Sequence, residues 1–408
     1  MRRGDAGRAR RARWCTMGGV GAQWVGDATA TSELEAAMRT LAPDCIKLGF
    51  GMMRLPKRED GTIDVETTAQ MVDEFLAAGG RYVDTAFVYE GSEDAVRQAL
   101  VERHPRDSYY LATKLNAGEW AAKDEAAAKA EFEQSLERTG AGYFDFYLLH
   151  ALSSDSVGLY DSYGIWEYVR DLKARGLVRH MGFSFHDGPE LLDRLLTEHP
   201  EVEFVQLQLN YADWEDPVVQ SRANYEVAVA HDVPVVVMEP VKGGTLAALP
   251  PAVAEIFRSA DATASPARWA IRFVASLPNV MMVLSGMSTP EQMADNLSFM
   301  RDFKPLSKEE AATVDEVRRA FDAIDRIACT SCHYCTGGCP VHMHIPDIFR
   351  TVNEYKLFGN LERSRKDYVR RAGDTLASEC IQCGQCEQAC PQHLPIVSLL
   401  EEAAATLE

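Results

Sequence analysis

The sequence lacks any apolar segment long enough to cross a membrane. Its longest apolar run is VPVVVMEPV at residues 233–241, which has the length of a strand, whereas a spanning helix needs ~20 mostly apolar residues. The first residues are Arg-rich, but the segment that follows, CTMGGVGAQWVGDATA, is too polar and too rich in glycine to be the apolar region of a secretion signal. We therefore expect a cytoplasmic protein that does not enter membranes.

Basic residues are also in short supply. The 408 residues include 42 Lys and Arg against 61 Asp and Glu, which gives a formal net charge of -19. A surface of that sign repels the phosphates of nucleic acids and anionic lipid headgroups. We expect neither nucleic acid nor a membrane surface to be a partner.

Cysteines are scarce outside one part of the chain. Of the ten, only Cys15 and Cys45 lie outside two short runs near the C-terminal end. Disulfide frameworks are not usually distributed in this way. The clustering favours metal ligation in a reducing compartment.

A strand and helix alternation occupies residues 46–305. Short runs rich in Val, Leu, Phe and Tyr are each followed by an amphipathic helical pattern, and eight such pairs can be counted. The alternation predicts an α/β fold, a closed (β/α)8 TIM barrel. An open doubly wound sheet is the alternative, but the fingerprint G-x-G-x-x-G is missing after the first strand.

The remaining parts of the chain differ from this pattern. Residues 1–45 have no clear periodicity, so we expect a disordered extension or a start codon assigned too early. Residues 306–328 are predicted to form a linking helix. Residues 329–408 form a second module, which we expect to be mostly α-helical because a helical pattern lies between the two cysteine runs.

Both cysteine runs have the spacing C-x-x-C-x-x-C-x-x-x-C-P. In bacterial two-cluster ferredoxins the fourth cysteine of such a run, next to Pro, ligates the other cluster. This spacing predicts two 4Fe-4S clusters, one held by Cys329, Cys332, Cys335 and Cys390, and the other by Cys380, Cys383, Cys386 and Cys339. Structural zinc is the alternative, but four tetrahedral ligands would leave the other cysteines without a role.

Polar side chains stand at the ends of three consecutive predicted strands. Asp84 and Tyr89 follow the second strand, Lys114 the third and His150 the fourth, and barrel enzymes place their chemistry at these ends. A buried Lys114 ammonium is expected to lower the pKa of Tyr89, ordinarily about 10, while Asp84 keeps Lys114 charged. Tyr89 would then be a general acid near neutral pH, and His150 would orient a carbonyl oxygen toward it. Any one of these residues alone would be explained as a polar group at a strand end without a catalytic role. The four together favour carbonyl reduction.

Residues 46 to about 300 resemble the aldo/keto reductases. The resemblance rests on the motif D-T-A-x-x-Y-x-x-S-E, the T-K ending of the third strand and the L-L-H ending of the fourth. It implies an oxidoreductase that uses a nicotinamide cofactor on a small carbonyl or alcohol substrate. It also implies that Asp84, Tyr89, Lys114 and His150 are the catalytic tetrad, with Tyr89 as proton donor.

The same resemblance implies the nicotinamide contacts. Ser184 and Gln206 would bind the carboxamide, and Gln292 and Asn296 would contact the adenosine end.

The choice between NAD and NADP depends on the residues at two positions near the adenosine end. Many members of the family place Lys and Arg against the 2′-phosphate of NADP, where this chain has Gly286 and Gln292. The loss of two cations favours NAD, although Lys242 could supply a substitute charge.

The cysteine-rich tail resembles the α-helical type of two-cluster ferredoxin domain. A nicotinamide passes two electrons as a hydride, whereas each cluster passes one electron at a time. One hypothesis is therefore an oxidoreductase in which electrons move between the clusters and the barrel site. Ferredoxin would be its partner, and a flavin, for which no motif is present, would convert between hydride and single electrons.

A second hypothesis is a carbonyl reductase whose clusters are structural or sense oxygen. A third is an inactive barrel with an iron–sulfur docking module, which the complete tetrad argues against. The substrate depends on loops whose sequence does not reveal it.

Overall fold

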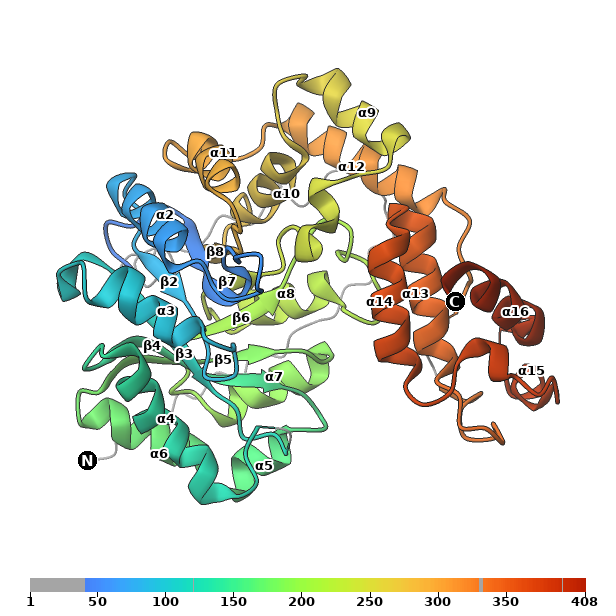
Figure 1. Cartoon of the computed structure of the whole chain (residues 1–408), viewed down its shortest axis with the longest axis horizontal. Coiled ribbons are helices and arrows are strands. Elements are labelled where there is room, and N and C mark those ends of the chain that lie inside the picture. Colours follow the sequence, from blue (N-terminus) through green and yellow to red (C-terminus); the bar gives the residue numbers. More distant parts are fainter. Residues whose placement is uncertain (1–40, 120, 330–332, 391) are drawn as a thin grey trace, which may run out of the picture.

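The structure is a computed structural model that describes residues 41–119, 121–329, 333–390 and 392–408. Its larger part is a closed barrel of parallel strands in which each strand pairs with the next and β8 pairs with β1 (Figure 1). The strands are β1 (Leu48–Gly51), β2 (Tyr82–Asp84), β3 (Tyr110–Leu115), β4 (Phe144–Leu152), β5 (Val178–Phe185), β6 (Phe204–Gln208), β7 (Val235–Met238) and β8 (Val280–Ser285). The predicted TIM barrel is confirmed, and the open sheet is excluded.

Helices surround the barrel and separate its strands in sequence. They are α2 (Val65–Ala77), α3 (Ser92–Val96), α4 (Glu125–Thr139), α5 (Val157–Ser162), α6 (Ile165–Ala174), α7 (Pro189–Glu198), α8 (Ser221–Ala230), α9 (Pro251–Ala260), α10 (Pro266–Ala275), α11 (Pro290–Met300) and α12 (Lys308–Asp322). Short 3-10 turns η1 (Met52–Arg54) and η4 (Lys242–Ala247) follow β1 and β7. Helices α5 and α9 were not among the eight predicted pairs. Helix α9 begins with Pro251 and buries Val253 and Phe257, so it forms by the usual amphipathic rule.

The interior of the barrel is filled by side chains. Tyr82, Phe146, Phe204 and Met282 belong to one buried cluster. Gly182 lies so close to the neighbouring strand that a Cβ there would be 2.5 Å from the carbonyl oxygen of Phe204. A ligand therefore has room only at the ends of the strands, as is usual for this fold.

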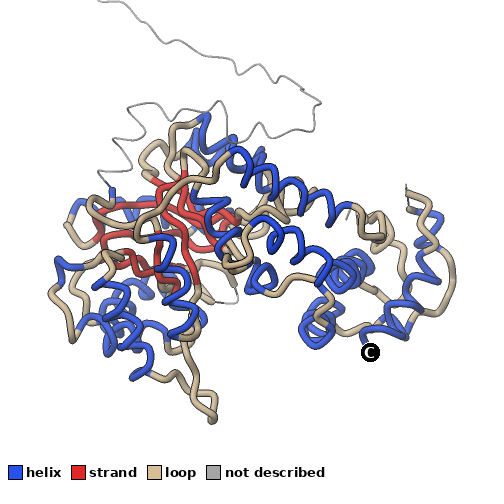
Figure 2. Tube along the Cα trace, turned by 90° about the horizontal axis from the view of Figure 1, so that it is seen from above, coloured by secondary structure: helices blue, strands red, loops and turns tan. Residues whose placement is uncertain are grey.

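The C-terminal part of the chain is helical and has its own core. Its helices are α13 (Ile345–Phe358), α14 (Leu361–Ala372), α15 (Gln385–Ala389) and α16 (Ile396–Leu407), with a 3-10 turn η5 (Ala377–Glu379). Met343, Phe349, Tyr368 and Leu400 are buried together, apart from the barrel core. Figure 2 shows this part beside the barrel, without strands among its described residues. The expectation of a mostly α-helical second module is confirmed.

Helix α12 packs on the barrel and leads to the helical part. Arg272 of α10 forms a salt bridge of 2.5 Å with Glu310 of α12. Near the end of α12 the ring of Phe321 lies 6.4 Å from that of Tyr211 and 5.4 Å from that of Phe358 in α13. Phe321 thus packs against an aromatic ring of the barrel and against one of α13, and so links the two parts of the chain.

A second contact joins α14 to the loop that follows β7. The Nη1 of Arg363 donates a hydrogen bond of 2.8 Å to the carbonyl oxygen of Gly243. Gly243 has a φ of 61°, and a Cβ at this position would lie 2.7 Å from the guanidinium of Arg363. The left-handed backbone favours glycine here, and a side chain at this position would also displace the Arg363 guanidinium.

Residues 1–40 lie outside the described residues, and so does most of the predicted N-terminal extension. Among the described residues, none of the helices combines the length and apolar character that crossing a membrane requires.

Candidate active site and cluster centre

A buried ion pair occupies the mouth of the barrel. Lys114 in β3 is completely buried, and its Nζ donates to Asp84 Oδ1 at 2.6 Å and to the carbonyl oxygen of Thr85 at 2.7 Å. Asp84 is the last residue of β2, which pairs with β3. Burial alone would lower the pKa of Lys114, but the Asp84 carboxylate and the Tyr89 phenol raise it above its usual value. The ammonium therefore stays charged at neutral pH.

Tyr89 and His150 lie against this pair. Tyr89 is in the turn between β2 and α3, and the Nζ of Lys114 is 5.0 Å from the centre of its ring. The imidazole of His150, from β4, meets the Tyr89 ring edge-on with a centroid distance of 5.7 Å. The structure thus brings together all four residues that the sequence predicted from three strand ends.

The expected direction of the Tyr89 pKa is wrong. Burial raises the pKa of Tyr89 above its usual value, and the Asp84 carboxylate adds to this effect, while Lys114 opposes it without reversing it. The charge of Lys114 alone would lower the pKa, but burying a phenolate carries a larger cost. In the resting site Tyr89 is therefore a protonated phenol.

His150 is neutral and has an unused ring nitrogen. Burial and the nearby charge of Lys114 lower its pKa well below the usual range of histidine. Among the described atoms, its Nδ1 is buried and has no hydrogen-bond partner. The next residue, Ala151, has a φ of 56° and donates its N–H to Ser184 Oγ at 2.7 Å. Left-handed backbone is uncommon for alanine and is often found at functional sites.

The residues expected to bind the carboxamide lie side by side. Ser184 and Gln206 are register partners on β5 and β6, and both are almost fully buried. The Oε1 of Gln206 has no hydrogen-bond partner among the described atoms. A buried acceptor without a donor fits an incoming amide N–H, so these residues suit the carboxamide of a nicotinamide.

The residues expected at the adenosine end hold their own loop. Gln292 is exposed, and its Oε1 accepts the N–H of Ser288 at 2.7 Å. Asn296 is buried and donates to Ser285 Oγ at 2.9 Å. Gly286 is exposed and offers no side chain. Contact of these residues with adenosine stays a prediction.

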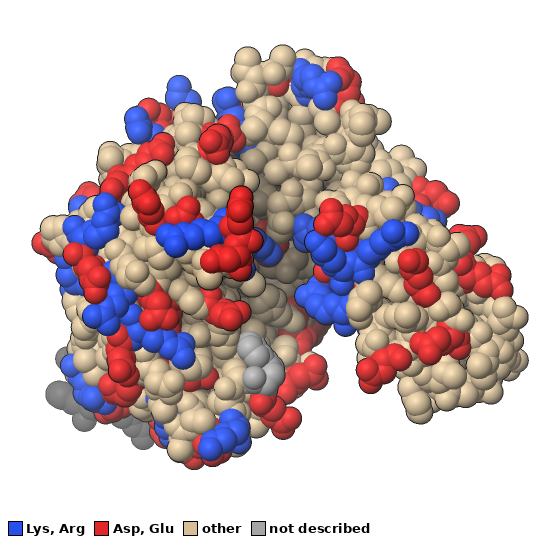
Figure 3. All heavy atoms as spheres, in the orientation of Figure 1, with Lys and Arg blue, Asp and Glu red and all other residues tan. Residues whose placement is uncertain are grey.

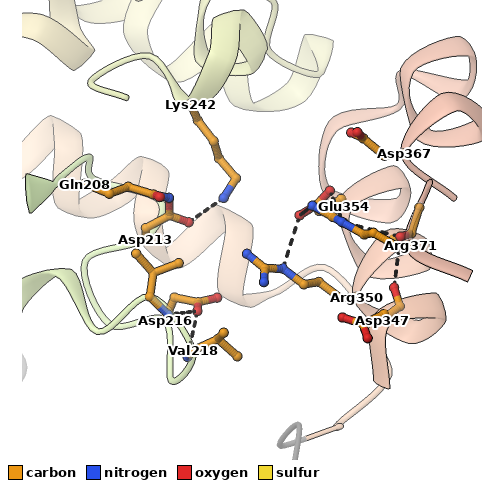
Figure 4. Close-up of polar contacts among 12 residues, drawn as sticks. Gln208, Asp213, Asp216, Val218, Lys242, Asp347, Arg350, Glu354, Asp367 and Arg371 are labelled. Carbon is orange, nitrogen blue, oxygen red and sulfur yellow. Dashed lines mark hydrogen bonds and ion pairs between the residues drawn. The ribbon is translucent and has the colours of Figure 1, made fainter. Parts of the chain in front are cut away.

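Lys242 is already paired. Its Nζ is 2.5 Å from Asp213 Oδ1 (Figure 4). Asp213 also accepts hydrogen bonds from Gln208 and Asn210. Burial acts to raise the pKa of Asp213, but Lys242 and these hydrogen bonds hold it below its usual range. A phosphate bound by Lys242 would have to compete with a buried carboxylate.

Three polar residues near the mouth were missed from the sequence. Arg54 follows β1, His186 follows β5 and Glu239 follows β7. The guanidinium of Arg54 is 3.4 Å from Glu239 Oε1, and its backbone oxygen accepts a hydrogen bond from Ser288. Each of the three is an ionisable residue within three positions after its strand, which is the signal in the sequence that could have identified it.

The cysteines line two small cavities in the helical part. One is lined by Cys329, Cys335 and Cys390. The other is lined by Cys339, Cys380, Cys383 and Cys386. Cys332 lies outside the described residues. Cys390 therefore lies with the two described leading cysteines of the first run, and Cys339 lies with the first three of the second, as the ligation of two-cluster ferredoxins requires.

The two runs end in the same local structure. The N–H of His342 bonds to the carbonyl oxygen of Cys339, and that of His393 to Cys390, each at 3.1 Å. Both histidines have a left-handed backbone conformation, with φ of 53° and 50°. The paired motif in the sequence is thus a structural repeat, in which the chain turns away from each fourth cysteine in the same way.

Within the described ranges, no three His, Cys, Asp or Glu side chains form a group that could hold a single metal ion. Tetrahedral zinc needs four ligands around one ion, whereas a 4Fe-4S cluster is held by thiolates spread around a larger body.

The comparisons with known proteins agree with both halves. The model of the aldo/keto reductase family matches residues 47–319, and that of the 4Fe-4S dicluster domain matches residues 328–394. An aldo-keto reductase of Mycolicibacterium vanbaalenii is 30% identical over 256 residues, which are 62% of this chain and 85% of that relative. One from Mycobacterium avium is 31% identical over 61% of this chain and 79% of the relative.

Solved structures share the barrel. An aldo-keto reductase from Bacillus halodurans has a TM-score of 0.54 at 24% identity and covers 66% of this chain and 91% of its own. One from Klebsiella pneumoniae, in complex with NADPH, has a TM-score of 0.54 at 23% identity and covers 67% and 90%. At these identities the likeness concerns the fold. The family match over the barrel is decisive, and the chain belongs to the aldo/keto reductase family, with a 4Fe-4S dicluster domain after the barrel.

Proposed function

We propose that the barrel site interconverts a small carbonyl compound and its alcohol, with Tyr89 as the proton donor in reduction. The observation that carries this proposal is the buried pair of Lys114 and Asp84 in contact with the phenol of Tyr89. A bound nicotinamide supplies or accepts the hydride at the carbonyl carbon. Tyr89 gives its proton to the carbonyl oxygen, which completes the alcohol.

The neighbours of Tyr89 divide the work of this proton transfer. Negative charge develops on the phenol oxygen as the proton leaves, and the Lys114 ammonium is already in place to stabilise it. Asp84 keeps Lys114 charged and fixed. The neutral imidazole of His150 is free to hydrogen-bond the substrate oxygen and to direct it toward Tyr89.

For the cofactor we infer a nicotinamide, held at the carboxamide by Ser184 and Gln206. The Klebsiella pneumoniae structures contain NADPH and NADP, which supports this class of ligand. Gly286 and Gln292 provide no positive charge for a 2′-phosphate, so NAD stays our preferred form.

The direction of the Tyr89 pKa predicts a pH profile. Because burial keeps the phenol protonated, kcat/KM for carbonyl reduction should stay level from about pH 6 to about pH 9 and fall only near or above the usual tyrosine pKa of about 10. Alcohol oxidation needs the deprotonated form, so its kcat/KM should rise with pH over the same range. A reduction rate that already falls by pH 8 with loss of one proton would show that Lys114 outweighs burial.

We further propose two 4Fe-4S clusters that exchange electrons with the barrel site. A cleft of about 760 Å³ between the barrel and the helical part is lined by Cys329 and by Lys242. The cleft therefore borders both a predicted cluster ligand and the loop after β7. A flavin or an external ferredoxin would convert between hydride and single electrons.

Anaerobic absorption spectra test this exchange. When NADH or NADPH is added to protein with intact clusters, the visible cluster absorbance should bleach within the time of one turnover. Dithionite provides the control, because it shows that the clusters can be reduced at all. Absorbance that stays constant while carbonyl reduction proceeds would instead favour clusters that stabilise the fold or sense oxygen.

A further inference from the structure

A groove crosses from the barrel mouth to the helical domain. It has a volume of about 390 Å³ and is lined on the barrel side by Arg54, His186, Gln208, Glu239 and Lys242. On the other side it is lined by residues of α13 and α14, among them Arg350, Arg363, Arg370 and Arg371. The residues of the barrel side follow or end β1, β5, β6 and β7. The groove is therefore a continuation of the barrel mouth.

The charge of this groove is opposite to that of the whole chain. Its lining has six cationic side chains, those of Arg54, Lys242, Arg350, Arg363, Arg370 and Arg371, and three carboxylates, those of Glu239, Glu354 and Asp367. Asp213 does not line the groove, but its carboxylate pairs with Lys242 and neutralises that charge. An excess of two positive charges therefore remains. The formal net charge of the chain is -19. In Figure 3, Lys and Arg gather on the side of the helical domain that faces the barrel.

The charge of Arg350 is only partly neutralised, because it shares a carboxylate with Arg371. Glu354 receives two short contacts from Arg371, of 2.9 and 3.2 Å. The Nε of Arg350 is 3.5 Å from the same carboxylate. One carboxylate thus serves two guanidinium groups. In Figure 4 the side chains of Arg350 and Lys242 extend toward the cleft from opposite sides.

The carboxylate of α14 is shared in the same way. Asp367 is 2.8 Å from Arg370 and 3.6 Å from Arg363. Arg363 is also held by the carbonyl oxygen of Gly243, which fixes this edge of the groove to the barrel. The side chain of Arg370 is 70% exposed, although its guanidinium contacts Asp367.

We propose that this groove binds an anionic group, a phosphate or a carboxylate, on a molecule whose reacting end lies in the barrel site. Guanidinium groups recognise both anions through paired N–H donors, and a cationic groove in an acidic protein attracts such ligands selectively. The inference rests on the proposed function for its reacting end. The helical domain then has a binding role besides holding clusters.

The groove borders the strands that carry the proposed carboxamide residues. His186 is two residues beyond Ser184, directly after the end of β5. Gln208 is two residues beyond Gln206 on β6. The anionic group has two sources, the phosphates of the nicotinamide dinucleotide or an acidic substrate.

Two variants and one matched control separate these sources. Arg350→Ala and Arg370→Ala each remove a cation of the groove, whereas Arg365→Ala removes an exposed arginine of α14 that faces the carbonyl of Thr406. Equilibrium dissociation constants for NADH and NADPH, measured by fluorescence titration, test the phosphates. KM values for succinic semialdehyde and for uncharged butyraldehyde test a substrate carboxylate.

We expect a loss of roughly 10-fold for the anionic ligand in each groove variant, since a hydrogen bond to a charged group is removed, and no change in the control. Weaker dinucleotide binding assigns the groove to the phosphates. A higher KM for the semialdehyde alone assigns it to the substrate. If both groove variants match wild type in every measurement, the proposal is wrong. Dinucleotide binding can be measured without turnover, so it tests the groove independently of catalysis. If the wild-type protein reduced neither aldehyde, the proposed function would be wrong.

Discussion

Replacing Tyr89 by Phe is expected to lower kcat for carbonyl reduction by about 10²–10⁴-fold, the usual contribution of a general acid. The variant loses only the phenol oxygen and retains the ring that contacts His150. Binding of the nicotinamide should be unchanged, because the proposed carboxamide contacts come from Ser184 and Gln206. Steady-state kinetics and an equilibrium titration of the dinucleotide measure the two quantities independently.

Tyr110→Phe is the matched control for this variant. Tyr110 begins β3, at the end of the barrel away from the mouth, and its hydroxyl donates to the carbonyl oxygen of Pro43. It should retain wild-type kcat. If Tyr89→Phe also turns over carbonyl substrates at the wild-type rate, the tetrad assignment fails and an inactive barrel with a docking module becomes the better explanation.

Replacing Cys390 by Ala is expected to remove the cluster that is held mainly by the first cysteine run. Cys390 lines the same cavity as Cys329 and Cys335, although it belongs to the second run. Iron content should fall from about eight toward about four atoms per chain, because a 4Fe-4S cluster needs its four thiolates. The reciprocal variant Cys339→Ala should remove the other cluster and leave a different electron paramagnetic resonance spectrum.

Cys45→Ala controls for the loss of a thiol as such. Cys45 lies before β1, and burial raises its pKa to about 11, so it is a poor ligand and a poor nucleophile. Full iron content is expected in this variant. The crossed ligation would be wrong if Cys390→Ala destroyed the cluster of its own run and left that of the first run with an unchanged spectrum.

The architecture could be predicted because its signals are local. Most strand residues of the barrel are buried, as in β8, where all positions are buried, so its sequence VMMVL reads as a continuous apolar run. The cysteine spacing is likewise local, since neighbouring ligands must follow one another along the chain. The proximity of Asp84, Tyr89, Lys114 and His150 was predictable because parallel strands in a barrel bring their carboxyl ends to one mouth.

Some properties of the site follow only from elements that are distant in sequence. The pKa of Tyr89 depends on how completely the mouth is closed, and the sequence indicated only its charged neighbour. The pairing of Lys242 with Asp213 joins loops after two different strands, so the substitute charge suggested for NADP is already matched.

The sequence by itself determined the barrel, the four polar strand ends and the cysteine spacing, because each is written in residues that are adjacent or regularly repeated. The tertiary structure alone decided the protonation of Tyr89, the pairing of Lys242 with Asp213 and the cationic groove. Burial and charge pairing depend on which surfaces meet, and the helical domain brings its arginines to the barrel mouth only after both parts have folded.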